Sequence, residues 1–187
     1  MMEVKTCFLV CPIGEENSET RKRSDKLMKY IIQPVCQEKG YVVERADLIH
    51  SNDKIYDTII NFLENSELVI ADVTDNNPNV FYELGYRTAK SLPVIQIAQK
   101  GHALPFDIGN IRAQFYELDL EKVDKFKEQL SQIIENIEET EKIKKAELAN
   151  QKANEVFTPD FQRTMIAALF NEFIKDPKKF KDLTNKD

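Results

Sequence analysis

The chain has 187 residues, of which 42% are apolar and 31% charged, enough to bury one core and carry an appendage. Its formal net charge of −6 argues against a general nucleic-acid-binding protein, because such proteins bind phosphates through clustered lysines and arginines. No apolar run approaches the roughly 18 residues of a membrane span, and no signal-peptide core is present. We therefore expect a soluble, cytoplasmic protein that binds a small molecule, with no membrane or nucleic-acid polymer as partner.

Three cysteines occur, Cys7, Cys11 and Cys36, without a Cys-x-x-Cys motif or a histidine at zinc-ligand spacing. This pattern is typical of reduced thiols in the core of a cytosolic protein. We expect no metal ion and no cofactor.

Five short apolar runs alternate with helical patterns. They cover residues 7–11, 41–43, 68–71, 93–98 and, more weakly, 113–118. Helices are expected over 18–39, with a kink at Pro34 and an end at Gly40, and around Ile55, Ile59, Phe62 and Leu63. Such alternation predicts an α/β fold, with a doubly wound, flavodoxin-like parallel sheet of five strands in residues 1–120 and helices on both faces.

Residues 121–187 form a predicted helical extension. An amphipathic helix over 123–137 is expected to pack on the sheet, and the polar stretch 138–155 reads as a solvated helix or linker, or as an oligomer seam. A last helix, capped by Thr158, carries an apolar face. Its members are Phe161, Met165, Ile166, Leu169, Phe170, Phe173 and Ile174. A face this apolar is expected to be buried, either against the domain or against a second copy of the chain in a homo-oligomer.

The most informative stretch is ADVTDNNPNVFYELGYR, residues 71–87. A polar loop follows a buried strand, Asn77 is a good N-cap and Pro78 suits the first helical position. Asn77 and Asn79 are also candidate ligands for the sugar or phosphate of a substrate. Asn79, Glu83 and Arg87 are four residues apart, so they share one helix face, expected to point into a crevice at the carboxyl ends of the strands. Because the helix is apolar nearly all round, an unpaired Glu83 would be costly without a function.

Other polar residues follow strand ends and are candidate ligands for the same crevice. In the first loop they are Pro12, Ile13, Gly14, Ser18 and Arg21, and after the second strand Asp47. An arginine there can hold a phosphate or carboxylate, and Asp47 either contacts a sugar hydroxyl or caps its loop. Asp72 is expected to orient Glu83, the two forming a carboxylate pair whose protonation is split by repulsion. The segment 100–110 resembles a lid, on which Phe106 stacks against a flat base beside Asp107; His102 reads as a surface histidine.

Taken together these residues resemble the nucleoside 2-deoxyribosyltransferase-like superfamily, relatives of TIR domains. The marks are CPIG at 11–14, SETRKRSD at 18–25, ERAD at 44–47, residues 71–87, PVIQIA at 93–98 and LPFD at 104–107. The resemblance implies that Glu83 is catalytic, either attacking the anomeric carbon of a deoxynucleoside or supporting cleavage of nicotinamide from NAD. Where the well-characterised transferases carry an aspartate-glycine element, this chain has NNPNV, as do many uncharacterised bacterial proteins, some of them assigned to antiphage signalling.

Two functions follow from these expectations. The first is an enzyme that cleaves or transfers the N-glycosidic bond of a nucleoside, nucleotide or NAD-like molecule through an oxocarbenium-like state that Glu83 stabilises or captures. The second is a non-catalytic nucleotide-sensing module that oligomerises through its C-terminal helices.

Overall fold

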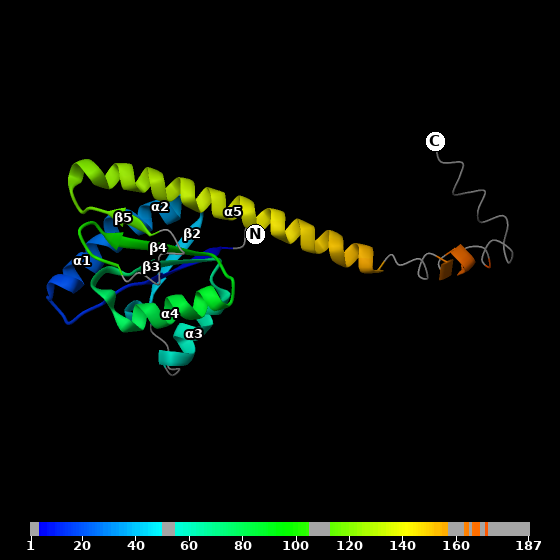
Figure 1. Ribbon diagram of the computed structural model, residues 1–187, viewed down its shortest axis with the longest axis horizontal. Coiled ribbons are helices and arrows are strands. Elements are labelled where there is room, and N and C mark those ends of the chain that lie inside the picture. The colour runs from blue at the N-terminus through cyan, green and yellow to red at the C-terminus, as the bar shows by residue number, and fades with distance from the viewer. Residues whose placement is uncertain are drawn as a thin grey trace. The chain divides into compact units, whose positions relative to one another are not determined.

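The computed structural model describes residues 4–49, 55–104 and 113–156, together with 163–164, 166–168 and 171. A parallel five-stranded sheet with the order β2-β1-β3-β4-β5 forms its centre (Figure 1). The strands are β1 (Lys5–Val10), β2 (Tyr41–Arg45), β3 (Leu68–Asp72), β4 (Val94–Gln99) and β5 (Gln114–Tyr116). The expected doubly wound parallel sheet is thus confirmed, and all five predicted strands are present.

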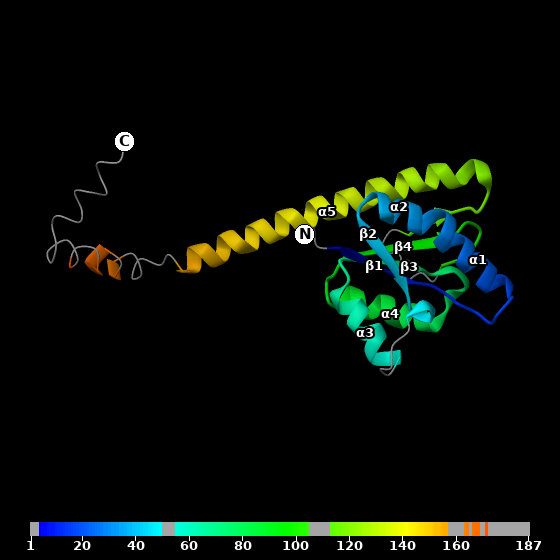
Figure 2. The ribbon, with the colours of Figure 1, turned by 180° about the vertical axis from the view of Figure 1, so that it is seen from behind.

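Helices cover both faces of the sheet (Figures 1 and 2). They are α1 (Glu19–Leu27), the π-helix η1 (Met28–Ile32), α2 (Gln33–Glu38), α3 (Ile55–Asn65), α4 (Pro78–Ala89) and α5 (Leu120–Val156), with 3-10 turns η2 (Ala46–Leu48) and η3 (Thr74–Asn76). Successive side chains of β3 point to opposite faces of the sheet, so the core has two parts. Leu68 and Ile70 pack with α1, α2 and α5 on one face, and Val69 and Ala71 pack with α3 and α4 on the other.

The strand order reverses between β1 and β3, because the chain leaves β1 toward β2 on one side and returns to β3 on the other. In doubly wound sheets, this switch point opens a crevice at the carboxyl ends of the strands. In register, Val10 lies beside Ala71, and Leu9 lies beside Arg45. The loops after β1, β2 and β3 therefore meet at one edge of the sheet.

The helix expected over 18–39 is present as α1, η1 and α2. Ser18 caps its start by accepting from the Arg21 N–H at 3.1 Å, and Gly40 follows its end with a φ of 77°. The irregularity lies before Pro34, as the π-turn η1, since a proline within a helix cannot supply its own N–H to the ladder.

Helix α5 spans two compact units, Met1–Ile137 and Glu138–Asp187. In the first, Phe126, Leu130 and Ile134 are buried against the sheet, as expected for this amphipathic stretch. The first unit thus extends beyond residue 120, because these side chains complete its core. In the second, residues 142–151 are all exposed, in agreement with a solvated helix.

Of the expected apolar face on the last helix, only Ile166 lies within the described residues, where it is exposed; its other members lie outside them. Across the described part of the chain, no helix has both the length and the apolar character needed to cross a membrane.

Candidate functional site

A cavity of about 350 Å³ lies over the end of β1, between the end of β2 and helix α4. Its polar or loop-borne lining residues are Ile13, Gly14, Arg45, Ala46, Asp47, Asn77, Asn79 and Glu83, and its apolar floor is formed by Phe8, Leu9, Val10, Cys11, Ile59 and Val80. The volume falls within the roughly 300–1,000 Å³ of small-molecule sites. The structure therefore brings together residues from three loops that the sequence placed at strand ends.

Glu83 lies half-buried in this cavity, on the second turn of α4. No hydrogen bond or ion pair reaches its carboxylate from the described residues, and burial raises its pKa to about 7. A carboxyl group with this pKa exchanges between charged and neutral forms near neutral pH. Such a group is suited to acid, base or nucleophilic chemistry.

Asn77 and Asn79 lie on the same wall as Glu83. The Asn77 Oδ1 accepts from the backbone N–H groups of Asn79 at 2.9 Å and Val80 at 3.4 Å, which confirms Asn77 as N-cap. Its side-chain oxygen is thereby engaged, whereas Asn79 is exposed and available to a ligand.

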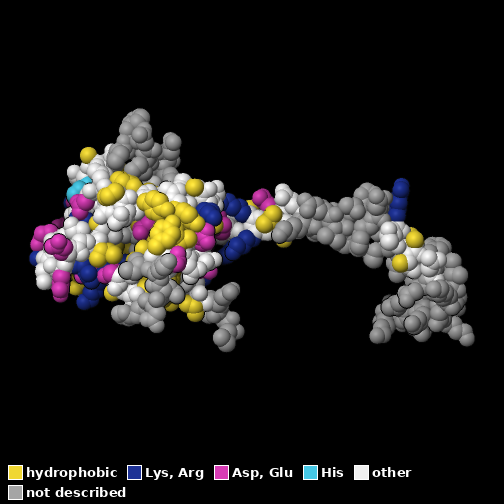
Figure 3. Space-filling model, turned by 90° about the horizontal axis from the view of Figure 1, so that it is seen from below, with side chains coloured by type: hydrophobic (Ala, Val, Ile, Leu, Met, Phe, Trp, Pro, Cys, Tyr) yellow, Lys and Arg dark blue, Asp and Glu magenta, His cyan; other side chains and the backbone are white. Residues whose placement is uncertain are grey.

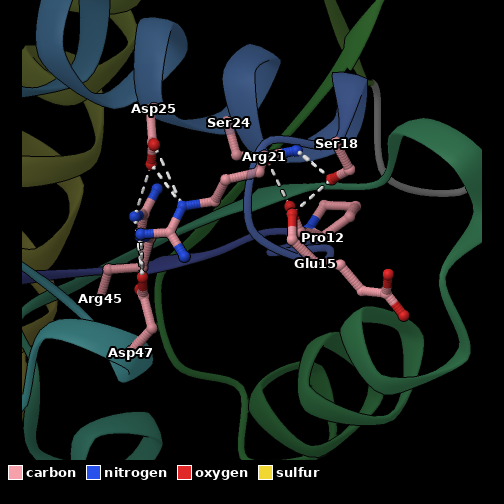
Figure 4. A network of polar contacts seen from close by, with 8 residues as sticks. All are labelled: Pro12, Glu15, Ser18, Arg21, Ser24, Asp25, Arg45 and Asp47. Atoms are coloured by element: carbon pink, nitrogen blue, oxygen red, sulfur yellow. Dashed lines mark hydrogen bonds and ion pairs between the residues drawn. The ribbon is translucent and has the colours of Figure 1, made fainter.

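The first loop contributes its backbone to the cavity more than its side chains. Gly14 has a φ of 68°, and a Cβ there would meet the Ser18 Oγ at 2.7 Å. Ser18 caps α1 and donates to the Glu15 carbonyl at 2.7 Å, while the Pro12 carbonyl accepts from Ser24 (Figure 4). Of the residues expected in this loop, Ile13 and Gly14 thus line the cavity, whereas Pro12 and Ser18 support the loop from behind.

Four charged residues form an ion-pair network at the β2 wall (Figure 4). Arg45, only 2% exposed, donates from Nε to Asp47 Oδ1 at 2.6 Å and from Nη2 to Asp25 Oδ1 at 2.7 Å. Burial alone would lower the pKa of Arg45, but hydrogen bonds to Asp47 and Asp25 outweigh it and raise the pKa, so the guanidinium stays charged. Its Nη1 is buried and has no hydrogen-bond partner among the described residues.

Arg21 belongs to the same network and not to the cavity lining. It lies 3.0 Å from Asp25 through Nε and 3.0 Å from Asp47 through Nη2. In the structure Arg21 pairs with the same two carboxylates as Arg45 and does not line the cavity, so an anion clamp at Arg21 stays a prediction. Arg45, which sequence reasoning noted only as the end of a strand, is the arginine of the cavity; its one signal was its place at a strand's carboxyl end.

Asp72 lies on the opposite face of the sheet from Glu83. It accepts from the Thr74 N–H at 3.1 Å, from the Thr74 hydroxyl, and from the Tyr116 hydroxyl at 3.0 Å. Burial raises its pKa, and these three hydrogen bonds oppose the rise. The expected carboxylate pair with Glu83 is not observed, because Asp72 shares the face of Leu68 and Ile70, whereas α4 covers the other face.

Arg87 also departs from the expected polar stripe. Its side chain is fully buried and donates to the carbonyls of Leu63 at 2.6 Å, Ser66 at 2.7 Å and Pro93 at 3.1 Å. Eight residues of helix separate it from Asn79, about 12 Å along the axis. Arg87 therefore ties the neighbourhoods of α3 and β4 to the far end of α4. Of the three residues in the expected stripe, Asn79 and Glu83 line the cavity and Arg87 does not.

A second hollow of about 390 Å³, lined by Ile59, Ile60, Asn79, Glu83 and two tyrosines, lies between α3 and α4. The hydroxyls of Tyr56 and Tyr82 are 3.1 Å apart, and both side chains are exposed. Figure 3 views this side of the molecule and shows apolar side chains gathered in one patch. Glu83 and Asn79 therefore border both hollows, a feature that the sequence did not reveal.

The remaining candidates contribute no reactive group to the described cavity, although Cys11 is part of its apolar floor. Cys7, Cys11 and Cys36 are free and buried, as expected, and burial raises the pKa of Cys11 to about 12, so it is no thiolate at neutral pH. His102 is exposed, with Nδ1 3.6 Å from Asp75. The expected contributions of Phe106 and Asp107 lie outside the described residues.

No protein-family model and no curated protein matches the chain. One similar solved structure is a 2-deoxyribosyltransferase from Bacillus psychrosaccharolyticus, with 15% sequence identity and a TM-score of 0.49; the match covers 65% of this chain and 90% of that chain. A 2-desoxiribosyltransferase from Leishmania mexicana has 15% identity and a TM-score of 0.40, over 50% of this chain and 64% of that chain. The CMP N-glycosidase BcmB from Clostridium botulinum has 17% identity and a TM-score of 0.49, over 67% of this chain and 98% of that chain. All three TM-scores lie below 0.5, so no chemical role is carried over from these proteins. The chemistry of this chain is inferred from the residues of its own cavity.

Proposed function

We propose that the chain cleaves or transfers the N-glycosidic bond of a nucleoside, nucleotide or NAD-like molecule, with Glu83 acting at the anomeric carbon. One observation carries the proposal: a carboxyl group without a cationic partner among the described residues, with a pKa of about 7, lies in a cavity of about 350 Å³ at the switch point of the sheet. A carboxylate beside an anomeric carbon stabilises or captures the oxocarbenium-like state in which the bond breaks.

The neighbours of Glu83 fit this role. Asn79 lies one turn before it on the same wall, where an exposed amide can hold a sugar hydroxyl. Asp47 lines the opposite wall, but its carboxylate is engaged by Arg45 and Arg21. Asp72 serves the fold in this proposal, because its acceptors are used by Thr74 and Tyr116.

The decisive experiment replaces Glu83 by glutamine, which keeps the shape of the side chain and removes the carboxylate. Wild-type protein is incubated with nucleosides, nucleotides and NAD, and free base is measured by chromatography. Glu83→Gln and Glu83→Ala are expected to abolish base release while retaining the circular dichroism spectrum of the wild type. Unchanged release by folded Glu83→Gln would exclude the assignment.

A nucleotide-sensing module is the second candidate, and the exposed stretch 142–151 of α5 favours it, because a solvated helix is free to meet a partner. In that case the same cavity would bind a nucleotide tightly in calorimetry without any release of base. Mass measurement in solution at high concentration, with and without nucleotide, would then report assembly; a strict monomer under both conditions would count against this candidate.

A further inference from the structure

The Arg45 guanidinium contains a donor that the described residues leave unused. Three of its hydrogen bonds go to Asp47 and Asp25, and these hold the group rigidly. The remaining nitrogen, Nη1, is buried and has no hydrogen-bond partner among the described residues, and Arg45 is one of the residues that line the cavity. An unsatisfied buried donor on a charged group is costly and rare, and therefore indicates an acceptor that arrives from outside.

The direction of the reaction places one part of the substrate at this wall. The cavity lies over β1, with α4 and Glu83 on one side and the end of β2, with Arg45, on the other. A carboxylate that attacks or stabilises an anomeric carbon acts on the face opposite the departing group. If Glu83 acts as proposed above, the base departs toward the β2 wall.

The charge of this wall indicates what the departing group carries. Arg21 and Arg45 are matched by Asp25 and Asp47, so the network as a whole is neutral and does not concentrate phosphate. A neutral carbonyl group on the base can approach Nη1. The carbonyl oxygen gains negative charge only as the N-glycosidic bond breaks. Binding that strengthens in the transition state accelerates the chemical step.

We propose that Arg45 is a catalytic residue that donates from Nη1 to a carbonyl oxygen of the leaving base, and that the preferred substrates are nucleosides or nucleotides of oxo bases. The C1′–N bond breaks, and its electron pair passes to the ring nitrogen and is delocalised onto the carbonyl oxygen beside Nη1. A Glu83 oxygen stabilises or bonds to C1′. The base takes one proton from water, and the hydroxide so formed completes hydrolysis at C1′ and restores the carboxylate.

The test compares inosine with purine riboside, which lacks the carbonyl, each as nucleoside and as 5′-monophosphate. Arg45→Lys retains a cation beside Asp47 but has no nitrogen at the Nη1 position. It is expected to lower kcat/KM for the inosine compounds about 10- to 100-fold and for the purine ribosides less than about threefold. Arg21→Gln, which disturbs the same two carboxylates, is the matched control and is expected to leave the ratio between the two substrates within about threefold.

A measurement on wild-type protein covers the case in which Arg45→Lys fails to fold. Hypoxanthine, the base of inosine, is expected to inhibit at a concentration about tenfold lower than purine. Equal inhibition by the two bases, or an equal loss for both substrates in folded Arg45→Lys, would overturn the role of Arg45 alone. Absence of base release from every substrate by the wild type would instead overturn the proposed function and this role with it.

Discussion

The Tyr116 hydroxyl donates a hydrogen bond of 3.0 Å to Asp72 Oδ2, on the face of the sheet that α4 does not cover. This bond joins the edge strand β5 to the end of the central strand β3. Together with the hydrogen bonds from Thr74, this bond explains why a carboxylate is buried at position 72. No role for Asp72 in the chemistry at Glu83 is needed.

Asp72→Asn is therefore expected to affect the fold more than the reaction. The amide accepts poorly where the carboxylate received three donors, so the free energy of unfolding should fall by about 1–3 kcal/mol. Base release per folded molecule should stay within about tenfold of the wild type. Urea unfolding and chromatography measure the two effects, and Tyr116→Phe, which removes one donor, is the companion variant. A fully folded but inactive Asp72→Asn protein would restore Asp72 to the catalytic group.

The pKa of Glu83 predicts how activity depends on pH. A carboxylate is required to attack or stabilise the anomeric carbon, and burial raises the pKa of this group to about 7. In the free enzyme kcat/KM should therefore fall about tenfold for each pH unit below about 7 and level off above it. Rates are measured from pH 5 to 9 on a nucleoside whose base does not titrate in that range. A flat profile between pH 5 and 7 would contradict the prediction.

The same pKa predicts a stability effect of the opposite sign to that of most carboxylates. Because the pKa rises from its usual 4.5 to about 7 on folding, the folded chain binds more protons in that window, and wild-type stability declines as pH increases through it. Glu83→Gln lacks this decline. Its stability relative to wild type should increase by about 1–2 kcal/mol between pH 4.5 and 8, less than the full shift because the carboxyl is only partly buried.

Thermal or urea unfolding at the two pH values measures that difference. Glu64→Gln is a useful control, since hydrogen bonds from Tyr86 and Lys90 lower the pKa of Glu64. The stability that this carboxylate contributes is present above a pH of about 4.5 and is lost only below it, so the stability of Glu64→Gln relative to wild type should change little between pH 4.5 and 8. The same trend in both variants would refute the assignment for Glu83.

Arg87→Lys tests the structural role of the buried arginine. A lysine cannot satisfy three carbonyls in the geometry of the guanidinium, so at least one is left unpaired in the core. The free energy of unfolding should fall by about 2–4 kcal/mol, while activity per folded molecule is retained. Lys90→Gln, at the C-cap of the same helix, removes an exposed pair with Glu64 and a contact with the Tyr86 ring, and should change the free energy of unfolding by less than about 1 kcal/mol. Loss of activity in a folded Arg87→Lys protein would return Arg87 to the site.

The sheet and the position of Glu83 were accessible from the sequence because each rests on local rules. Apolar runs predicted the strands, and the cap at Asn77 with Pro78 predicted the start of α4. Four-residue spacing then placed Asn79 and Glu83 on one wall. These features depend on neighbours a few residues apart, and the structure reproduces them except for Arg87, which the same spacing placed on the cavity face and which is buried elsewhere.

The interaction partners of the charged residues could not be predicted from the sequence in the same way. Whether Asp72 meets Glu83 depends on which face of the sheet α4 covers, and this follows from the handedness of the whole chain path. Arg21 and Arg45 share Asp25 and Asp47 across two different elements, so neither one alone indicated which arginine would line the cavity. Such contacts arise from tertiary packing.

Gly14 places a mutational constraint on the first loop that extends beyond its own position. Any larger residue there would have to adopt a left-handed backbone and displace the Ser18 hydroxyl, which lies 2.7 Å from where a Cβ would be. Ser18 caps the helix that presents Arg21 and Asp25, so a substitution at position 14 would also disturb the network around Arg45. Variation that changes ligand preference is therefore open at Ile13 and Asn79, and closed at Gly14.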